Sequence, residues 1–251
     1  MTLFLFARRT LCRGVGAAVL ALAAGSAAAQ QVLQIGRVDF PSPLSDIAES
    51  VVREAFKRSG LQGEYRRLPL LRSVALANEG SLDGELMRIV DVGKNFPDLV
   101  RVPTPVVMAD VALYSMDEAV ANLPRAEQRK RKVGLTRGTL MLVKHSQGMD
   151  VIDTQSISTA FEMLANQRFD MTILIFLDAE PEIGRKGIKN VYRRPHYWAS
   201  EPLYFYLNNK HAALVPKIDA ALLDMQKEGV IKKIFRDKLT EMGIAPLLPA
   251  D

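Results

Sequence analysis

The feature that most constrains the fold is an alternation of short apolar runs with amphipathic segments, which begins near residue 32 and starts again near residue 132. Apolar runs of four to eight residues are typical of buried strands, whereas apolar residues at helical spacing indicate helices. Strands that alternate with helices favour parallel sheets with helical covers. Two such series in roughly 220 residues predict two α/β lobes of about 100 residues each.

The predicted elements follow the chain in a regular order. The helix at residues 45–59 places Ile47, Val51 and Phe56 on one face, and Gly80 closes the next helix. We predict strands at residues 32–36, 64–68, 83–88, 106–114, 132–136, 171–177 and 203–207, and helices at residues 45–59, 70–79 and 158–167, from Thr139, and over most of 212–239.

Two features of the 45–59 helix concern its ends and its exposed face. Asp46 and Glu49 at its start predict an acidic, box-like cap. The pairs Glu49–Arg53 and Glu54–Arg58 have the i,i+4 spacing of ion pairs on a solvent-exposed helix face.

The N-terminus has the three-part pattern of a secretory signal peptide. Arg8, Arg9 and Arg13 form a basic segment, an uncharged apolar run covers residues 14–29, and the run ends in three alanines. A membrane anchor is the alternative, but the run of about 16 residues is shorter than the roughly 20 that a spanning helix needs. We therefore predict a signal peptide at residues 1–29 and a periplasmic protein. The paired arginines leave the general and the twin-arginine export routes open.

Removal of that segment changes both the cysteine content and the charge. The single cysteine, Cys12, lies inside it, so the mature chain has no disulfide and no thiolate metal site. The formal net charge of the whole chain is +5, and loss of three arginines lowers it to +2. This small excess does not indicate a nucleic-acid partner, and the charged run at residues 123–132 is typical of a solvated surface.

Five stretches, in order, resemble the polar amino-acid type of periplasmic solute-binding proteins (bacterial extracellular solute-binding proteins, family 3). The first three are LANEGSLDG at residues 76–84, VPTP at 102–105 and VGLTRGT at 133–139. The others are MLANQRFD at 163–170 and KEGVIKKIF at 227–235. The likeness covers nearly the whole mature chain.

The resemblance implies a type II periplasmic binding fold with one lobe interrupted in sequence and a two-segment hinge. It places the first lobe at residues 30–114 and 201–251 and the second at 115–200, with crossings near Tyr114–Ser115 and Ser200–Leu203. A membrane permease of an ABC importer is the implied partner, and a monomer is expected.

In two places the chain departs from the family pattern. The arginine that usually grips the α-carboxylate is missing from residues 93–97, GKNFP. The acid that usually holds the α-ammonium is missing from residues 173–176, ILIF. These departures leave the identity of the ligand open.

Ligands of open α/β sheets bind beyond the carboxyl ends of the strands, and this rule selects candidate residues independently of the resemblance. The selected residues follow four predicted strands and should converge on one cleft. They are Asp39, Phe40, Arg88, Arg137, Gly138, Thr139 and Asp178.

Each candidate has a functional and a structural interpretation. Arg88 could clamp an anionic group with its planar guanidinium, or could form an ion pair with Glu85 or Asp91. Gly138 and Thr139 could present a helix N-terminus to an anion, or Thr139 could cap the helix. Phe40 could stack on the ligand or belong to the core. Asp39 and Asp178 could accept hydrogen bonds from ligand amines or hydroxyls, or could be ordinary exposed acids.

The sequence predicts a protein that binds a small polar, anionic ligand for an ABC importer and does not act as an enzyme. The three histidines, His145, His196 and His211, lack metal-ligand spacing, and no nucleophile elbow, phosphate loop or dinucleotide motif occurs. No metal or other cofactor is predicted. The alternatives are a periplasmic dehydratase of a cyclic acid, with Glu85 or Asp178 moving protons beside Arg88, and a ligand-sensing subunit of a signalling system.

The signal peptide can be tested directly. Mass spectrometry of protein from the periplasm should give an N-terminus near Gln30 or Gln31, because the small residues before them fit a signal-peptidase site. Full-length protein retained in the inner membrane would contradict this prediction.

Overall fold

Two sheets share the long strand β10 (Ala199–Asn208) in this computed structural model, which describes residues 32–244 and residue 247. The predicted signal peptide at residues 1–29 therefore lies outside the described residues. The strands follow the order β2-β1-β3-β10-β5-β8-β6-β7, with β4 also paired to β10 and β9 to β5. The remaining strands are β1 (Val32–Val38), β2 (Gln62–Leu68), β3 (Gly84–Arg88), β4 (Leu99–Arg101), β5 (Val107–Ser115), β6 (Lys132–Thr136), β7 (Asp150–Thr154), β8 (Met171–Ile175) and β9 (Tyr192–Arg193).

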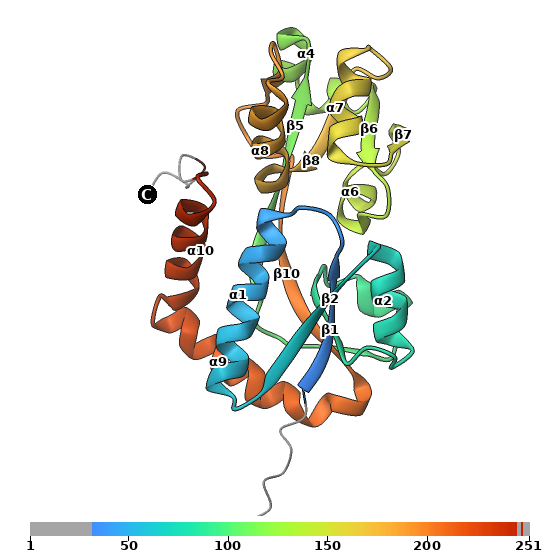
Figure 1. Cartoon of the computed structure of the whole chain (residues 1–251). Coiled ribbons are helices and arrows are strands. Elements are labelled where there is room, and N and C mark those ends of the chain that lie inside the picture. The colour runs from blue at the N-terminus through green and yellow to red at the C-terminus, as the bar shows by residue number, and fades with distance from the viewer. Residues whose placement is uncertain (1–31, 245–246, 248–251) are drawn as a thin grey trace, which may run out of the picture. The chain divides into compact units, whose positions relative to one another are not determined.

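The part from Val32 onward is a two-lobed α/β structure, as predicted, with helices covering each sheet (Figure 1). Pairs that involve β1 and β6 are parallel, whereas pairs that involve β5 and β10 are antiparallel. The helices are α1 (Pro43–Arg58), α2 (Leu70–Asn78), α3 (Val92–Asn95), α4 (Glu118–Asn122), α5 (Arg125–Gln128), α6 (Leu140–His145), α7 (Ile157–Ala165), α8 (Phe176–Lys186), the 3-10 helix η1 (Asn209–Leu214), α9 (Val215–Lys227) and α10 (Val230–Glu241).

Helix α1 packs its predicted apolar face on the first sheet, but it begins differently from the prediction. Ser42 is the N-cap, because its hydroxyl accepts a hydrogen bond from the Ser45 amide and Pro43 supplies the first helical residue. Asp46 and Glu49, predicted to form an acidic cap, instead bind Arg37 at the end of β1. A buried guanidinium nearby gives these carboxylates stronger partners than the helix amides.

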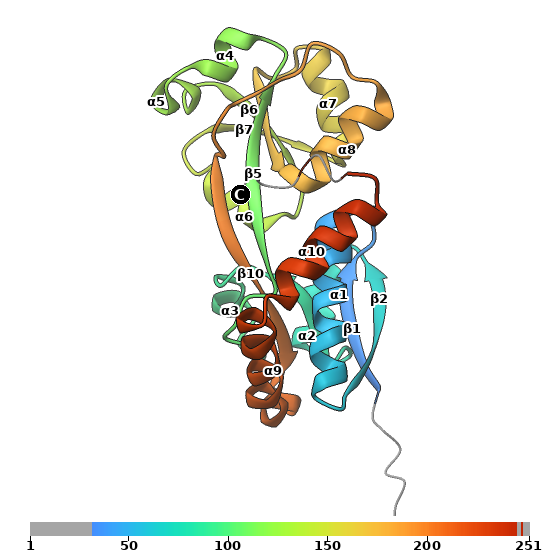
Figure 2. The ribbon, with the colours of Figure 1, turned by 90° about the vertical axis from the view of Figure 1, so that its left-hand side faces the viewer.

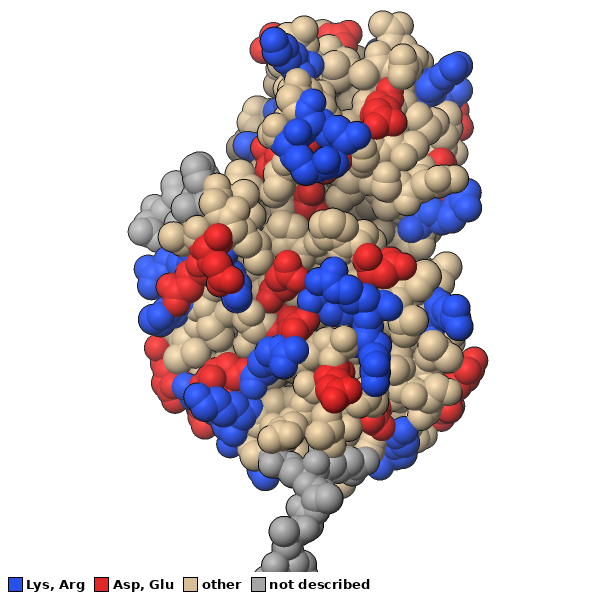
Figure 3. Space-filling view, in the orientation of Figure 1, with Lys and Arg blue, Asp and Glu red and all other residues tan. Residues whose placement is uncertain are grey.

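The surface beside α1 and β2 carries charges of both signs. The predicted pairs Glu49–Arg53 and Glu54–Arg58 are present, and Arg66 of β2 pairs with Glu64. Figure 3 shows the result on this face, where basic and acidic side chains are interspersed. Such exposed pairs contribute little stability individually.

The second lobe differs from the sequence prediction in strand β7, which was not predicted, and at residues 176 and 177. The strand predicted at 171–177 ends at Ile175, and α8 begins at Phe176. The apolar run continues through both elements, so periodicity alone did not separate them. Pro181 lies inside α8, where it hides the helical pattern. As a result, Asp178 belongs to the first turn of a helix rather than to the end of a strand.

Strand β10 joins the two sheets by changing partners along its length. Its residues 199–203 pair with β5, and Tyr204, Tyr206 and Leu207 pair with β3 or β4. Figure 2 shows β5 and β10 side by side as they pass between the lobes. Residues 111–114 of β5 already pair with β8, so β5 enters the second sheet before Tyr114. The lobe boundaries at residues 115 and 201 stay a prediction.

The C-terminal helices pack against the first lobe. Gly229, with a φ of 73°, separates α9 from α10 and so interrupts the helix predicted over most of residues 212–239. Both helices contact α1 (Figure 1). Among the described residues, no helix is long and apolar enough to cross a membrane.

Because β3 lies close to β10, we predict that Gly84 cannot be replaced by a larger residue without loss of stability. A methyl group there would lie 2.5 Å from the Tyr206 carbonyl oxygen, which is backbone and cannot move aside freely. Gly84→Ala should lower the free energy of unfolding by about 1–3 kcal/mol, measured by denaturant titration. Gly184→Ala in α8 is the control, because nothing lies within 4 Å of its added Cβ. Equal effects of the two substitutions would contradict the packing argument.

Candidate functional site

A cavity of about 60 Å³ lies where the strand ends of the two sheets face each other. The first lobe contributes residues after β1, at the start of α2 and at the end of β3, and the second contributes the start of α6 and the β8–α8 junction. Ten of the fourteen lining residues are apolar and four are polar. The apolar ones are Val38, Phe40, Leu70, Met87, Ile89, Val92, Leu140, Met141, Ile175 and Leu203, and the polar ones are Ser42, Arg88, Thr139 and Asp178.

The strand-end rule located this cavity but not every residue in it. Phe40, Arg88, Thr139 and Asp178 line the cavity together. Asp39, Arg137 and Gly138 do not. Whether any of these residues binds a ligand stays a prediction.

The three predicted residues outside the cavity have other surroundings. Asp39 is exposed beside the half-buried Phe40. Arg137 is 68% exposed and lies 3.8 Å from Asp153, from Nε to Oδ2. Gly138 lies close to the side chain of Leu71. Its positive φ of 81° allows the turn between β6 and α6.

Arg88 lines the cavity but already has an internal partner. Its guanidinium pairs with the carboxylate of Glu85, and its Nη1 donates to the Met87 carbonyl oxygen at 2.8 Å. Glu85 is fully buried and accepts a hydrogen bond of 2.6 Å from the Ser73 hydroxyl. Burial raises the pKa of Glu85, and the positive charge of Arg88 opposes that rise. Arg88 therefore forms the ion pair with Glu85 that the sequence analysis gave as the alternative to an anion clamp. This pair balances the charge of the guanidinium.

Thr139 lies at the start of α6, as predicted. It is the N-cap residue of that helix, but its side chain makes no capping hydrogen bond. Its hydroxyl therefore adds a neutral polar group to the cavity lining.

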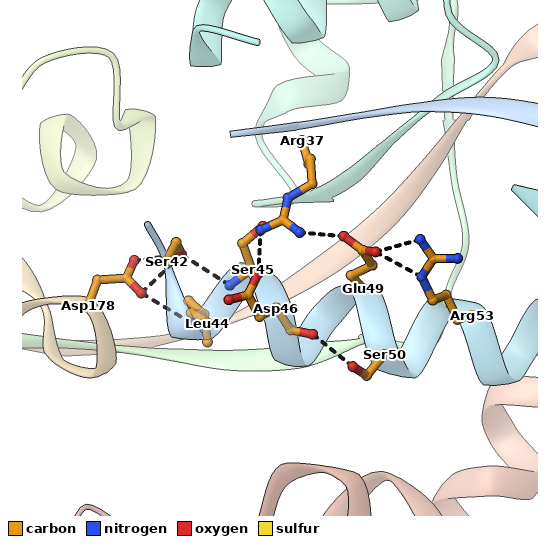
Figure 4. Close-up of polar contacts among 9 residues, drawn as sticks. All are labelled: Arg37, Ser42, Leu44, Ser45, Asp46, Glu49, Ser50, Arg53 and Asp178. Atoms are coloured by element: carbon orange, nitrogen blue, oxygen red, sulfur yellow. Dashed lines mark hydrogen bonds and ion pairs between the residues drawn. The ribbon is translucent and has the colours of Figure 1, made fainter. Parts of the chain in front are cut away.

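Asp178 connects the two lobes. Its carboxylate accepts hydrogen bonds from the Ser42 hydroxyl, 3.0 Å from each oxygen, and from the Leu44 amide at 3.2 Å (Figure 4). Both donors belong to the N-terminus of α1, 134 and 136 residues away. No ion pair to Asp178 occurs among residues 32–244. Burial raises its pKa to about 7, the two hydrogen bonds oppose the rise and the charge of Asp46 adds to it.

An ion-pair network lies beside this contact on α1 (Figure 4). Arg37 binds Asp46 at 2.6 Å and also Glu49, which binds Arg53 at 2.7 Å. Burial disfavours the charge of Arg37, but its bonds to Asp46 and Glu49 outweigh this and raise its pKa. Because Arg37 pairs with Asp46, that acid cannot serve as the cation-binding partner of a ligand without losing an existing contact.

Sequence reasoning missed Ser42 and most of the apolar lining. A signal for Ser42 was present, since a serine followed by proline is a typical helix start. Met87, Leu140, Ile175 and Leu203 carry no such signal, because apolar residues at these positions are equally typical of a core. Among the described residues, no cluster of three or more histidine, cysteine or acidic side chains could hold a metal ion.

No protein-family model and no curated protein matches the sequence. Solved structures do match. The ligand-binding core of GluR0 in complex with L-glutamate has a TM-score of 0.72 at 16% identity, over 84% of this chain and 99% of that one. A histidine kinase sensor domain with similarity to periplasmic binding proteins has a TM-score of 0.68 at 16% identity, over 84% and 96%.

A third similar structure is the arginine-, lysine-, histidine-binding protein ArtJ from Geobacillus stearothermophilus. Its TM-score is 0.66 at 15% identity, over 84% of this chain and 96% of that one. At these identities the likeness concerns the fold. The chain therefore has the two-lobed fold of periplasmic amino-acid-binding proteins, and the resemblance inferred from the sequence is confirmed at that level.

The buried carboxyl of Asp178 predicts a pH-dependent stability. Because its folded-state pKa of about 7 exceeds the unfolded value, its contribution to stability is complete at low pH and is lost as pH rises toward 7. Relative to Asp178→Asn, the wild type should lose on the order of 4 kcal/mol of unfolding free energy between pH 3.5 and pH 8. Denaturant titrations across that range measure the difference. A constant difference would contradict the burial argument.

Proposed function

We propose that this chain is a periplasmic solute-binding protein, which captures a small molecule in the cavity between its lobes and does not transform it. The observation that carries the proposal is that one cavity draws its lining from both lobes, at the carboxyl ends of their strands. The similar structures support it, because one is a ligand-binding core in complex with L-glutamate and another is an arginine-, lysine-, histidine-binding protein.

The connection between the lobes suits such a role. β5 and β10 run together from one sheet to the other, so the lobes can change their angle through few backbone torsions. A ligand that contacts both lobes stabilises the arrangement in which it touches both.

Binding without turnover fits the chemistry of the lining. The described residues around the cavity include no histidine and no cysteine. Glu85 is fully buried and paired with Arg88, so it does not reach the cavity as a free base. A dehydratase would need an acid or base at the substrate, and Asp178 is the remaining carboxyl group that faces the cavity.

We do not extend the proposal to an anionic ligand. That prediction depended on Arg88 and on the helix N-terminus at Gly138 and Thr139. Gly138 lies outside the cavity lining, and Glu85 already pairs with the guanidinium of Arg88. An anion entering the cavity would have to compete with a buried carboxylate for the same group.

We further propose that the ligand is delivered to the membrane permease of an ABC importer. The resemblance of the ordered motifs to importer-associated binding proteins supports this partner.

Ligand binding can be tested by thermal shift. A matching compound from a set of amino acids, amines, carboxylates and aromatic acids should raise Tm, because binding to the native state alone stabilises it. Ile175→Trp should abolish the shift, since the larger side chain fills the cavity. Val143→Trp on α6 is the matched control, because Val143 is 49% exposed and outside the lining.

The fate of the ligand separates the candidate functions. Compound recovered unchanged after long incubation supports a binding protein, whereas loss of water and carbon dioxide from a cyclic acid would establish the dehydratase. Absence of any thermal shift across the whole set would refute the proposed function.

A further inference from the structure

The charges around the cavity leave one group without an oppositely charged partner. Of the four polar lining residues, Ser42 and Thr139 are neutral. Arg88 is balanced by Glu85. Asp178, whose hydrogen bonds come from a neutral hydroxyl and a backbone amide, has no cationic partner in the described part of the chain.

The elements packed around α8 do not supply that partner. α1 presents Asp46, β5 presents Asp110 and Tyr114, α7 presents Glu162, and β8 has no titratable side chain. Asp46 adds repulsion to the buried carboxylate. Arg193 of β9 pairs with Glu180, another residue of α8. Ionised Asp178 is therefore a buried negative charge without compensation.

The Asp178 carboxylate keeps capacity for another donor. Each carboxylate oxygen has two lone pairs, so four acceptor positions exist in total. The single hydroxyl proton of Ser42 can serve one oxygen at a time, and the Leu44 amide serves Oδ1. A cation at the cavity side could therefore bind without displacing either donor, and it would gain an ion pair in surroundings of low dielectric constant.

The rest of the cavity lining favours a ligand whose uncharged part is apolar. Ten of its fourteen residues are apolar, and none of the four polar ones offers an uncompensated positive charge. A ligand carboxylate would therefore be buried against groups that cannot balance it, at a large desolvation cost. This disfavours zwitterions and anions in the cavity.

We propose that Asp178 makes this cavity a binding site for a small monovalent cation with an apolar body, such as an alkyl ammonium that carries no carboxylate. The inference rests on the proposed function and adds the class of ligand. In it, the ammonium donates to the Asp178 carboxylate, and the alkyl group contacts the apolar lining shared by the two lobes.

Binding of a cation has a protonation consequence. Burial holds the pKa of Asp178 at about 7 in the unliganded protein, and an adjacent ammonium lowers it. Near pH 7 the binding of an amine should therefore release a proton. Below pH 7, affinity should fall by up to about tenfold per pH unit, because the carboxyl must first lose its proton.

The experiment uses matched probes that differ in the charge of one end. Ethylamine, isobutylamine and isoamylamine are each compared with the alcohol and the carboxylate of the same carbon skeleton, by calorimetry and thermal shift on the mature protein at pH 8. At least one amine should bind, at least tenfold more tightly than its alcohol, while the carboxylates should not bind measurably.

Substitution of Asp178 completes the test. Asp178→Asn keeps an acceptor oxygen for α1 and removes the charge, so amine affinity should fall at least tenfold and its pH dependence should disappear. The affinity for the alcohol should change less than threefold, which would show that the substitution leaves the cavity intact. Asp39→Asn is the matched control, because Asp39 is an exposed acid outside the lining.

The outcomes are distinguishable. Preference for carboxylates, or amine binding that Asp178→Asn leaves unchanged, overturns this inference while the proposed function stands. Failure of every amine overturns it as well, and the wider thermal-shift set then decides the proposed function separately. Calorimetry in two buffers of different ionisation enthalpy should detect the released proton near pH 7, and its absence would also count against the inference.

Discussion

Strand β10 is the element on which the arrangement of the lobes depends, because its backbone hydrogen-bonds to both sheets. Its first half pairs with β5 and its second half with β3 and β4. A strand cannot slip by one residue without moving its side chains to the opposite face, so this double pairing fixes both registers at once. The carboxyl ends of β1, β3 and β8 consequently face one another, and the cavity forms between them.

Burial of charge governs what this cavity can hold. A charge removed from water is costly unless it is paired and hydrogen-bonded. Arg88 and Glu85 pair with each other and Ser73 donates to Glu85, although Arg88 Nε and Glu85 Oε1 are buried without a hydrogen-bond partner in the described part of the chain. Asp178 meets that condition in part, through the hydroxyl of Ser42 and the amide of Leu44, and burial keeps its pKa near neutrality. The same carboxyl group is both a contact between the lobes and the uncompensated charge of the cavity.

Sequence reasoning succeeded where a signal is local. Helix α1 and strand β6 follow from patterns within fifteen residues, and the end of α2 follows from Gly80. It failed at α8, because one apolar run continues from β8 into the helix and Pro181 hides the helical period. It also misjudged Asp46 and Glu49, whose spacing fits a helix cap, because Arg37 comes from a different element.

The sequence by itself determined the alternation of strands and helices, and hence that Phe40, Arg88 and Thr139 lie at or near the ends of elements on one edge of the sheets. It placed Asp178 at the end of a strand, whereas Asp178 belongs to the first turn of α8. Periodicity and capping are properties of neighbouring residues, so they can be read along the chain. The tertiary structure decided which partner each residue has: Glu85 for Arg88, and Ser42, 136 residues away, for Asp178. Those pairings depend on how distant elements pack and on how much water is excluded there, and neither quantity is encoded in a local pattern.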